Sequence, residues 1–187
     1  MNDKKQQIFQ TAVALFESEG LSVTTARIAK EAGVSNGTLF NYYATKQDLI
    51  DTVYIEIKKE VAGAILDDLN PDDSSRDFFY AIWHGYIDWA MANIQKHNVC
   101  FLLKSSQMLG AEACEAVDAI FQTVNDRSEK GFVSKEMREI PVKYLCDIAV
   151  AQMAAAIAYA NKENLTGDAL KAHVELSFDI HWNGVKR

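Results

Sequence analysis

The sequence predicts an all-α protein, and three observations support this fold class. Apolar side chains recur at the spacing of an amphipathic helix, as at Phe9, Ala12 and Phe16 near the N-terminus. No segment alternates polar and apolar residues with the two-residue period of a strand. Only two prolines occur in the 187 residues, so long helical segments run without a residue that breaks them. The pattern indicates about nine helices.

Three short helices are expected over residues 1–47, each with a start or stop signal. A side-chain hydroxyl caps a helix at its start, and a glycine readily adopts the left-handed conformation that ends one. These signals are Gly20 after the first helix, Thr24 or Thr25 before the second, Gly33 after the second and Ser35 before the third. In the third helix Leu39 and Tyr43 have the i, i+4 spacing of an inward face.

A larger helical-bundle domain is expected over residues 48–187. The sequence Thr-Lys-Gln-Asp at 45–48 has the pattern of a capping box and begins a helix that runs to about Leu69. The clearest break follows at 70–75, which includes Pro71. The other expected elements are an aromatic helix over 78–94, a break near His97 and Asn98, a short helix to Gly110, a helix over 111–130, a loop over 131–139, a helix after Pro141 and a last helix over about 166–184.

Composition excludes several classes of protein. No apolar run approaches the roughly 20 residues that span a bilayer, and the N-terminus lacks the apolar stretch of a secretory signal. Cys100, Cys114 and Cys146 are odd in number and widely spaced, so neither a disulfide framework nor a zinc site is indicated. We therefore expect a cytoplasmic protein with no membrane partner, no bound metal and no cofactor.

Charge is distributed unevenly along the chain. The first 50 residues carry as many basic as acidic side chains, so the whole net charge of −7 lies in the rest. An acidic body repels DNA and helps to turn a neutral, locally basic head toward it. The charge distribution therefore permits binding to nucleic acid but does not by itself indicate it.

Residues 25–44 have the pattern of a helix-turn-helix, whose second helix enters the DNA major groove. Gly37 allows close approach of the backbone, and Thr38 offers a hydroxyl for phosphate and a methyl for thymine. Asn36 and Asn41 carry amides that suit adenine, while hydroxyl and ammonium groups suit phosphate. The candidate DNA contacts are Thr25, Arg27, Asn36, Gly37, Thr38, Asn41, Tyr42 and Lys46. Thr24, Ser35 and Thr45 are better explained as helix caps, and Arg27 also fits a solvated helix face.

The run IFQTAVALFESEGLSVTTARIAKEAGVSNGTLFNYYATKQDLI, residues 8–50, resembles the N-terminal domain of TetR-type bacterial transcriptional regulators. The resemblance implies phosphate or base contacts for four residues, Thr25, Thr38, Tyr42 and Lys46. It implies operator reading for three others, Asn36, Gly37 and Asn41. Two departures stand out, because Phe40 lacks the hydroxyl of the family's commoner tyrosine and Tyr42 replaces a frequent histidine.

In the body, an aromatic helix that is apolar on two faces belongs inside a bundle. Polar groups among these apolar helices suggest a small-molecule site, although core packing is the better explanation for each aromatic residue taken singly. The candidate ligand-binding residues are Trp83, His84, Tyr86, Phe101, Gln107, Met108, Gln152 and Tyr159. The resemblance implies an effector that binds in this part of the chain, and the lining indicates an apolar or aromatic molecule.

The resemblance implies a homodimer in which the last two helices form a four-helix bundle with those of a twofold mate. Their small and apolar side chains fit this arrangement, although an alanine-rich helix equally fits an internal core. The candidate interface residues are Ala151, Ala155, Val174, Phe178 and Trp182. Twofold pairing would place two reading helices on half-sites roughly 34 Å apart, as in a palindromic operator. The expected function is a repressor that an effector releases from such an operator. An activator or a DNA-independent partner-binding protein remains the alternative. An enzyme built on His84 and Asp88 is disfavoured, since no nucleophile or metal set accompanies them.

Overall fold

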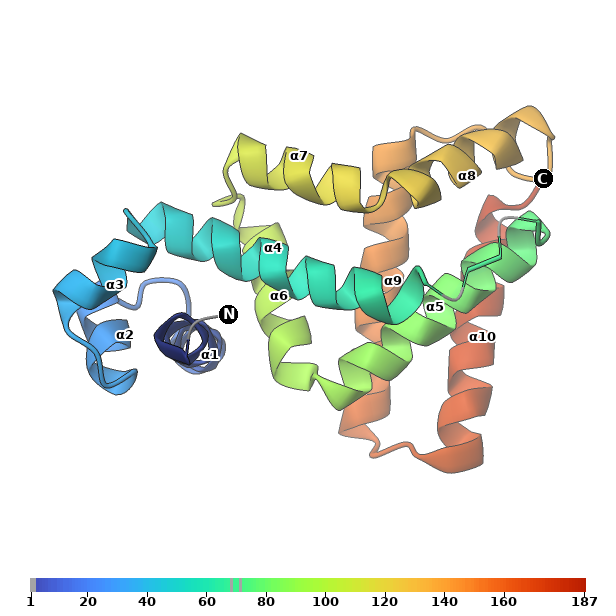
Figure 1. Cartoon of the computed structure of the whole chain (residues 1–187). Helices are drawn as coiled ribbons and strands as arrows, with labels where there is room; N and C mark the ends of the chain where they lie inside the picture. The colour runs from blue at the N-terminus through green and yellow to red at the C-terminus, as the bar shows by residue number, and fades with distance from the viewer. Residues whose placement is uncertain (1–2, 68, 71) are drawn as a thin grey trace. The chain divides into compact units, whose positions relative to one another are not determined.

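The computed structural model describes residues 3–67, 69–70 and 72–187, and the all-α prediction is confirmed within them. Pro71 lies outside the described residues. The described part contains ten helices, close to the expected nine (Figure 1). They are α1 Asp3–Glu19, α2 Thr25–Glu31, α3 Asn36–Tyr42, α4 Lys46–Ile65, α5 Ser75–Ala92, α6 Ile94–Ser106, α7 Ala111–Ile120, α8 Gln122–Val133, α9 Val142–Lys162 and α10 Gly167–Val185.

The additional helix arises because the expected helix over 111–130 is two helices. Phe121 leaves the helical conformation with φ −101° and ψ 18°, and α8 begins after it. The sequence has no glycine or proline there, so it gives no local signal for the break. The expected helix over 45–69 is also shorter, since α4 ends at Ile65.

The break expected near His97 and Asn98 lies earlier, at Asn93. Asn93 takes φ −132° and ψ 42°, outside the helical region, and α6 begins after it. His97 and Asn98 are instead inside α6. His97 is only 5% exposed, and the Asn98 amide donates to the Glu17 carboxylate at 3.2 Å. Tertiary contacts thus keep these two polar residues in a helix.

The chain divides into two compact units. The first contains residues 3–60 and 93–119, and the second contains residues 61–92, apart from positions 68 and 71, with residues 120–187. The first unit combines α1 to α3 and most of α4 with α6 and α7. The second combines α5, α8, α9 and α10 with the end of α4. The domain boundary expected at residue 47 stays a prediction.

The core of the first unit forms around α1. Phe9 and Phe16 are buried on it at the predicted helical spacing, and Leu39 and Tyr43 at the other side of this core are buried as well. Helix α1 contacts α2, α3 and α6. The short helices of the N-terminal part are therefore held by one longer helix.

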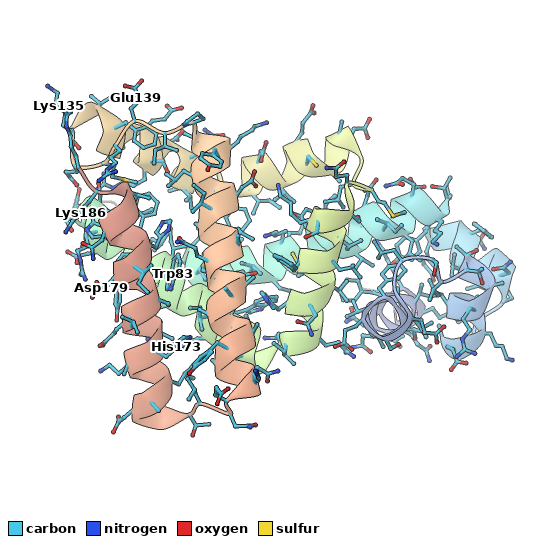
Figure 2. All side chains as sticks on the ribbon, turned by 180° about the vertical axis from the view of Figure 1, so that it is seen from behind. Trp83, Lys135, Glu139, His173, Asp179 and Lys186 are labelled. Carbon is cyan, nitrogen blue, oxygen red and sulfur yellow. The ribbon has the colours of Figure 1, made fainter. Side chains whose placement is uncertain are left out.

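The core of the second unit is aromatic and joins α5 to α10. Trp83 stacks on His181 with ring centroids 4.9 Å apart, and its indole Nε1 donates to Oγ of Ser177 at 2.9 Å. Figure 2 labels Trp83 among the side chains of this unit. The His181 ring in turn lies with Nδ1 2.5 Å from Oε1 of Gln152 on α9. Because an amide oxygen only accepts, Nδ1 carries a proton and donates to Gln152.

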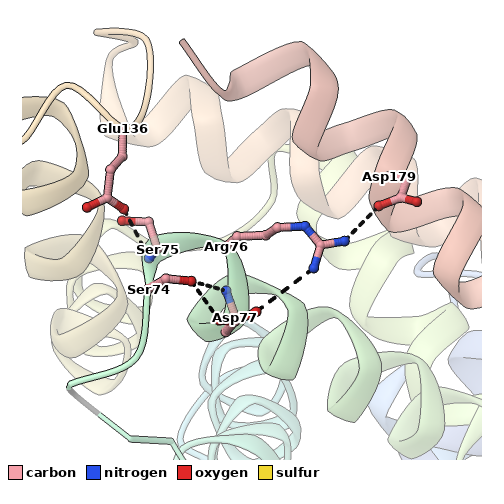
Figure 3. A network of polar contacts seen from close by, with 6 residues as sticks. All are labelled: Ser74, Ser75, Arg76, Asp77, Glu136 and Asp179. Carbon is pink, nitrogen blue, oxygen red and sulfur yellow. Dashed lines mark hydrogen bonds and ion pairs between the residues drawn. The ribbon is translucent and has the colours of Figure 1, made fainter.

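Polar contacts fix the start of α5 at the break that the sequence predicts (Figure 3). The Asp77 backbone N–H donates to Oγ of Ser74 at 3.1 Å, and that hydroxyl donates to the Asp77 carboxylate at 2.7 Å. The Ser75 N–H donates to Glu136 at 3.1 Å, which binds the loop after α8 to this helix end. Arg76 donates to Asp179 on α10 at 2.9 Å.

Burial of His181 makes the stability of the protein depend on pH. Burial lowers the pKa of His181 from 6.5 to about 4, so between these values the unfolded chain binds a proton that the folded chain does not. We expect His181 to contribute a loss of about 2 kcal/mol in the free energy of unfolding when the pH falls from 7 to 5. Urea unfolding at both pH values measures this loss. His181→Gln lacks it, and an equal pH dependence in both proteins would contradict the assignment.

Candidate nucleic-acid interface

The helix-turn-helix begins with caps that the sequence predicts. Thr24 Oγ1 accepts from the Arg27 N–H at 3.2 Å before α2, and Ser35 Oγ accepts from the Thr38 N–H at 3.0 Å before α3. Before α4, the Asp48 N–H donates to Thr45 Oγ1 at 3.0 Å and the Thr45 N–H donates to the Asp48 carboxylate at 3.1 Å. This reciprocal pair confirms the capping box.

The turn between α2 and α3 depends on Gly33. Its φ of +64° lies in the left-handed region that glycine adopts without strain. The next residue, Val34, donates its N–H to the Ala29 carbonyl at 3.0 Å and closes the end of α2. Local chemistry thus sets the direction in which α3 leaves the turn.

Helix α3 has a buried side and an exposed side. Leu39 is fully buried, and Tyr43, which follows the helix, is 2% exposed. The predicted reading residues Asn36, Gly37 and Asn41 are all exposed or partly exposed, and two others, Thr38 and Tyr42, also reach the surface. The predicted face therefore exists as a continuous outer surface of the helix.

Gly37 has no steric role within the chain. A Cβ placed there would meet Ser35 Oγ at 3.8 Å, an ordinary contact, and its φ is not in the left-handed region. Glycine inside a helix destabilises it by about 0.5–1 kcal/mol relative to alanine. An exposed helical glycine that the fold does not require suits close approach by a partner.

The charged candidates are already engaged within the chain. Arg27 forms ion pairs with Glu19 at 3.4 Å and with Glu31 at 3.1 Å, so its charge is balanced locally. Lys46 Nζ donates to the Leu21 carbonyl at 2.6 Å, which uses one of three ammonium protons. A phosphate could accept from another proton of this ammonium group at the N-terminus of α4, where backbone amides also favour an anion.

Several known proteins that are similar to this chain are bacterial regulators. Residues 8–53 match the family described as bacterial regulatory proteins, tetR family. A tetR family transcription regulator from Shewanella sp. PV-4 is similar over 98% of both chains, with 29% identity and a TM-score of 0.89. Residues 8–53 thus match the N-terminal part of the tetR family, and the fold of the whole chain is similar to that of a tetR family transcription regulator.

Two curated relatives are similar to this chain over part of its length. LuxR of Vibrio harveyi, an HTH-type transcriptional regulator, is 26% identical over 145 residues, or 77% of this chain and 68% of LuxR. The nucleoid occlusion factor SlmA of Actinobacillus pleuropneumoniae is 28% identical over 95 residues, which are 50% of this chain and 47% of SlmA. The chain thus spans about half the length of SlmA.

The eight predicted ligand-binding residues of this chain divide between the two compact units. Phe101, Gln107 and Met108 belong to the first unit and the other five to the second. Trp83 and Tyr86 are buried in their own unit's core. A cleft of about 370 Å³ in the second unit contains one of the eight, and it is lined by Ala64, Ile65, Leu69, Tyr80, Ala81, His84 and Gly85.

Several predicted ligand residues have structural partners. Gln107 ends α6 with φ +57°, the Gln152 amide binds His181, and the Tyr159 ring lies 5.1 Å from that of His173. Nδ1 of His84 lies 2.9 Å from Oδ2 of Asp88. An enzyme would use this pair as a base and the group that orients it. The family is one of regulatory proteins, and the ligand-binding role of these residues stays a prediction.

The predicted dimer residues divide into buried and exposed groups. Val174, Phe178 and Trp182 are no more than 8% exposed within the chain's own second unit, whereas Ala151 and Ala155 are exposed. Sequence reasoning missed other exposed apolar side chains of the same two helices, Tyr144, Leu176 and Ile180. Leu176 and Ile180 have i, i+4 spacing, and this is the signal that could have found them.

Proposed function

We propose that this chain is a sequence-specific DNA-binding transcriptional regulator that acts in the cytoplasm. The observation that supports it best is the exposed face of α3, where a glycine that the fold does not require lies among amide and hydroxyl side chains. At a glycine the helix backbone can approach a base edge or a phosphate more closely than at any residue with a side chain. The HTH-type relatives and the capped turn before α3 support the same function.

Adding a methyl group at Gly37 separates folding from DNA binding. Gly37→Ala is expected to stabilise the fold by about 0.5–1 kcal/mol, since helical glycine is unfavourable. The same methyl group is expected to weaken operator binding roughly tenfold, or by about 1.4 kcal/mol. Thermal unfolding and fluorescence anisotropy on a duplex selected from a random pool measure the two effects.

The matched control is Gly63→Ala. Gly63 is also an exposed helical glycine, and a methyl group added there would meet no atom within 4 Å outside its own helix turn. We expect this substitution to stabilise the fold and leave operator affinity unchanged. Unchanged operator affinity in Gly37→Ala would remove α3 as the reading helix.

Lys46 is proposed to contact a phosphate from the start of α4. Each phosphate contact adds about 0.9 to the slope of log affinity against log salt concentration. Lys46→Ala is expected to flatten this slope by about one unit, measured by operator titrations at several salt concentrations. Lys59→Ala, an exposed lysine of α4 paired with Glu56, serves as the control and should leave the slope unchanged. An unaltered slope in Lys46→Ala would exclude the phosphate contact.

We also propose that two copies pair through the outer faces of α9 and α10. Exposed apolar side chains stand on both helices, and Leu176 and Ile180 are 59% and 60% exposed. Burying such side chains stabilises association by about 25 cal/mol per Å² of apolar surface. A twofold pair also suits a palindromic operator, because a single seven-residue α3 reads few base pairs.

Charge in this surface is expected to separate the copies. Leu176→Glu combined with Ile180→Glu should shift the mass in solution from that of a dimer to the 20.9 kDa of one chain. Sedimentation velocity measures the change. Val133→Glu replaces another exposed apolar residue, 84% exposed on α8, and should leave the dimer intact. A dimer that persists in the double variant would place the interface elsewhere.

A small-molecule effector is proposed to release the operator by a population shift. Useful control requires the effector to prefer the DNA-incompetent state by about 1–3 kcal/mol. Two hydrogen bonds inside the first unit could transmit a movement to α4. The Gln47 side chain donates to the Met108 carbonyl at 2.7 Å, and the Gly110 N–H donates to the Asp51 carboxylate at 3.0 Å. These bonds join the turn after α6 to the start of α4. Equal operator affinity with and without saturating effector would exclude the mechanism.

A further inference from the structure

We propose that α3 selects A·T base pairs and that the Phe40 ring reads the 5-methyl group of thymine. This inference rests on the proposed DNA-binding function and names the base pairs that such an operator contains. It is drawn from the chemistry of the side chains that α3 exposes, and it gives a role to a ring that has no hydroxyl for phosphate.

Helix α3 lacks the side chains that read guanine best. Guanine presents two acceptors in the major groove, and arginine or lysine is the side chain that pairs with them best. Helix α3, residues 36–42, is described throughout and contains neither of these residue types. Arg27 is on α2 and is held by Glu19 and Glu31. Lys30 is also on α2, and the first helix of such a motif crosses the backbone instead of reading bases.

Helix α3 exposes two amide side chains that suit adenine. Asn36 and Asn41 both reach the surface of α3. An asparagine amide matches adenine in the major groove, because its oxygen accepts from the N6 amino group while its nitrogen donates to N7. An α3 with two such amides and no cation offers more to an A·T pair than to a G·C pair.

The Phe40 ring lies at the surface of α3, on the same flank as Gly37. This ring is 42% exposed, although phenylalanine is usually buried. It follows Asn36 by four residues and Gly37 by three, so the three share one flank of the helix. The missing side chain of Gly37 leaves space beside the ring.

The Phe40 ring has no group that donates to phosphate. Its favourable contact in the major groove is with an apolar group, and the apolar group there is the thymine methyl. Because adenine pairs with thymine, a single A·T pair can satisfy an amide of α3 on one base and the ring on the other. The amides and the ring on this flank therefore favour the same base pair.

The test uses the full-length protein and duplexes selected from a random pool. The selected half-sites should have A·T pairs at the positions that α3 protects. Replacing each thymine with deoxyuridine removes only its methyl group. At the thymine that Phe40 contacts, wild-type affinity should fall about fourfold per half-site, which corresponds to about 0.8 kcal/mol for one buried methyl group.

A double-mutant cycle assigns the effect to Phe40. Phe40→Ala should lose affinity on the thymine duplex and lose less on the deoxyuridine duplex, so the two changes are not additive. Phe40→Tyr keeps the ring and should keep the discrimination between thymine and deoxyuridine. Circular dichroism checks that both variants fold, as expected for a side chain outside the core.

The outcomes separate this inference from the proposed function. Selected half-sites with G·C pairs under α3, or equal losses from Phe40→Ala on both duplexes, would overturn the inference and leave DNA binding intact. Failure to select any sequence from the pool would overturn the proposed function itself. Selection of A·T pairs together with a non-additive cycle would support both.

Discussion

Helices of seven residues are not stable alone in water, and both α2 and α3 have that length. The reading head therefore depends on the packing of these two helices against α1. Phe9 and Phe16 of α1, with Leu39 and Tyr43, bury the apolar sides of the motif. Since the inward positions of α3 are committed to this core, the packing requirement is weakest at its exposed positions Asn36, Gly37 and Asn41. That weak requirement is what allows the exposed side chains to be chosen for recognition.

Charge has a smaller role in this head than in many DNA-binding proteins. Arg27 is balanced by two glutamates, and Lys46 already donates to a carbonyl. Non-specific attraction to the phosphate backbone is thus weak for a protein of net charge −7. In the proposed function, discrimination between sequences then depends on short-range contacts from α3, which are strong only on a matching sequence. An acidic body adds repulsion that disfavours every arrangement except the one with the head toward DNA.

What the sequence predicts correctly here is set by local chemistry. Caps such as Thr24 and Ser35, and the positive φ of Gly33, depend on residues a few positions away. The break at Phe121 has no glycine or proline to signal it, so local chemistry could not have placed it. The same holds for Phe178, expected at a dimer interface but buried within the second unit, because periodicity identifies an apolar face without naming what covers it.

Helix α9 is rich in small apolar side chains, and the proposed pairing of two copies explains those on its exposed face. Among the described helices it is the one long and apolar enough to cross a membrane by length and composition, with a mean hydropathy of 1.3 over its most apolar window and 22% of that window buried. The core helix of a soluble protein meets the same criteria of length and composition. Ala151 and Ala155 are small enough for close helix approach, and Leu176 and Ile180 on neighbouring α10 add larger apolar groups. Small side chains beside large ones allow this surface to interdigitate with an identical surface, as the proposed pairing of two copies requires. Helix α9 also carries the charged residues Lys143 and Asp147 near its start. A neighbouring protein helix tolerates such charges better than lipid does.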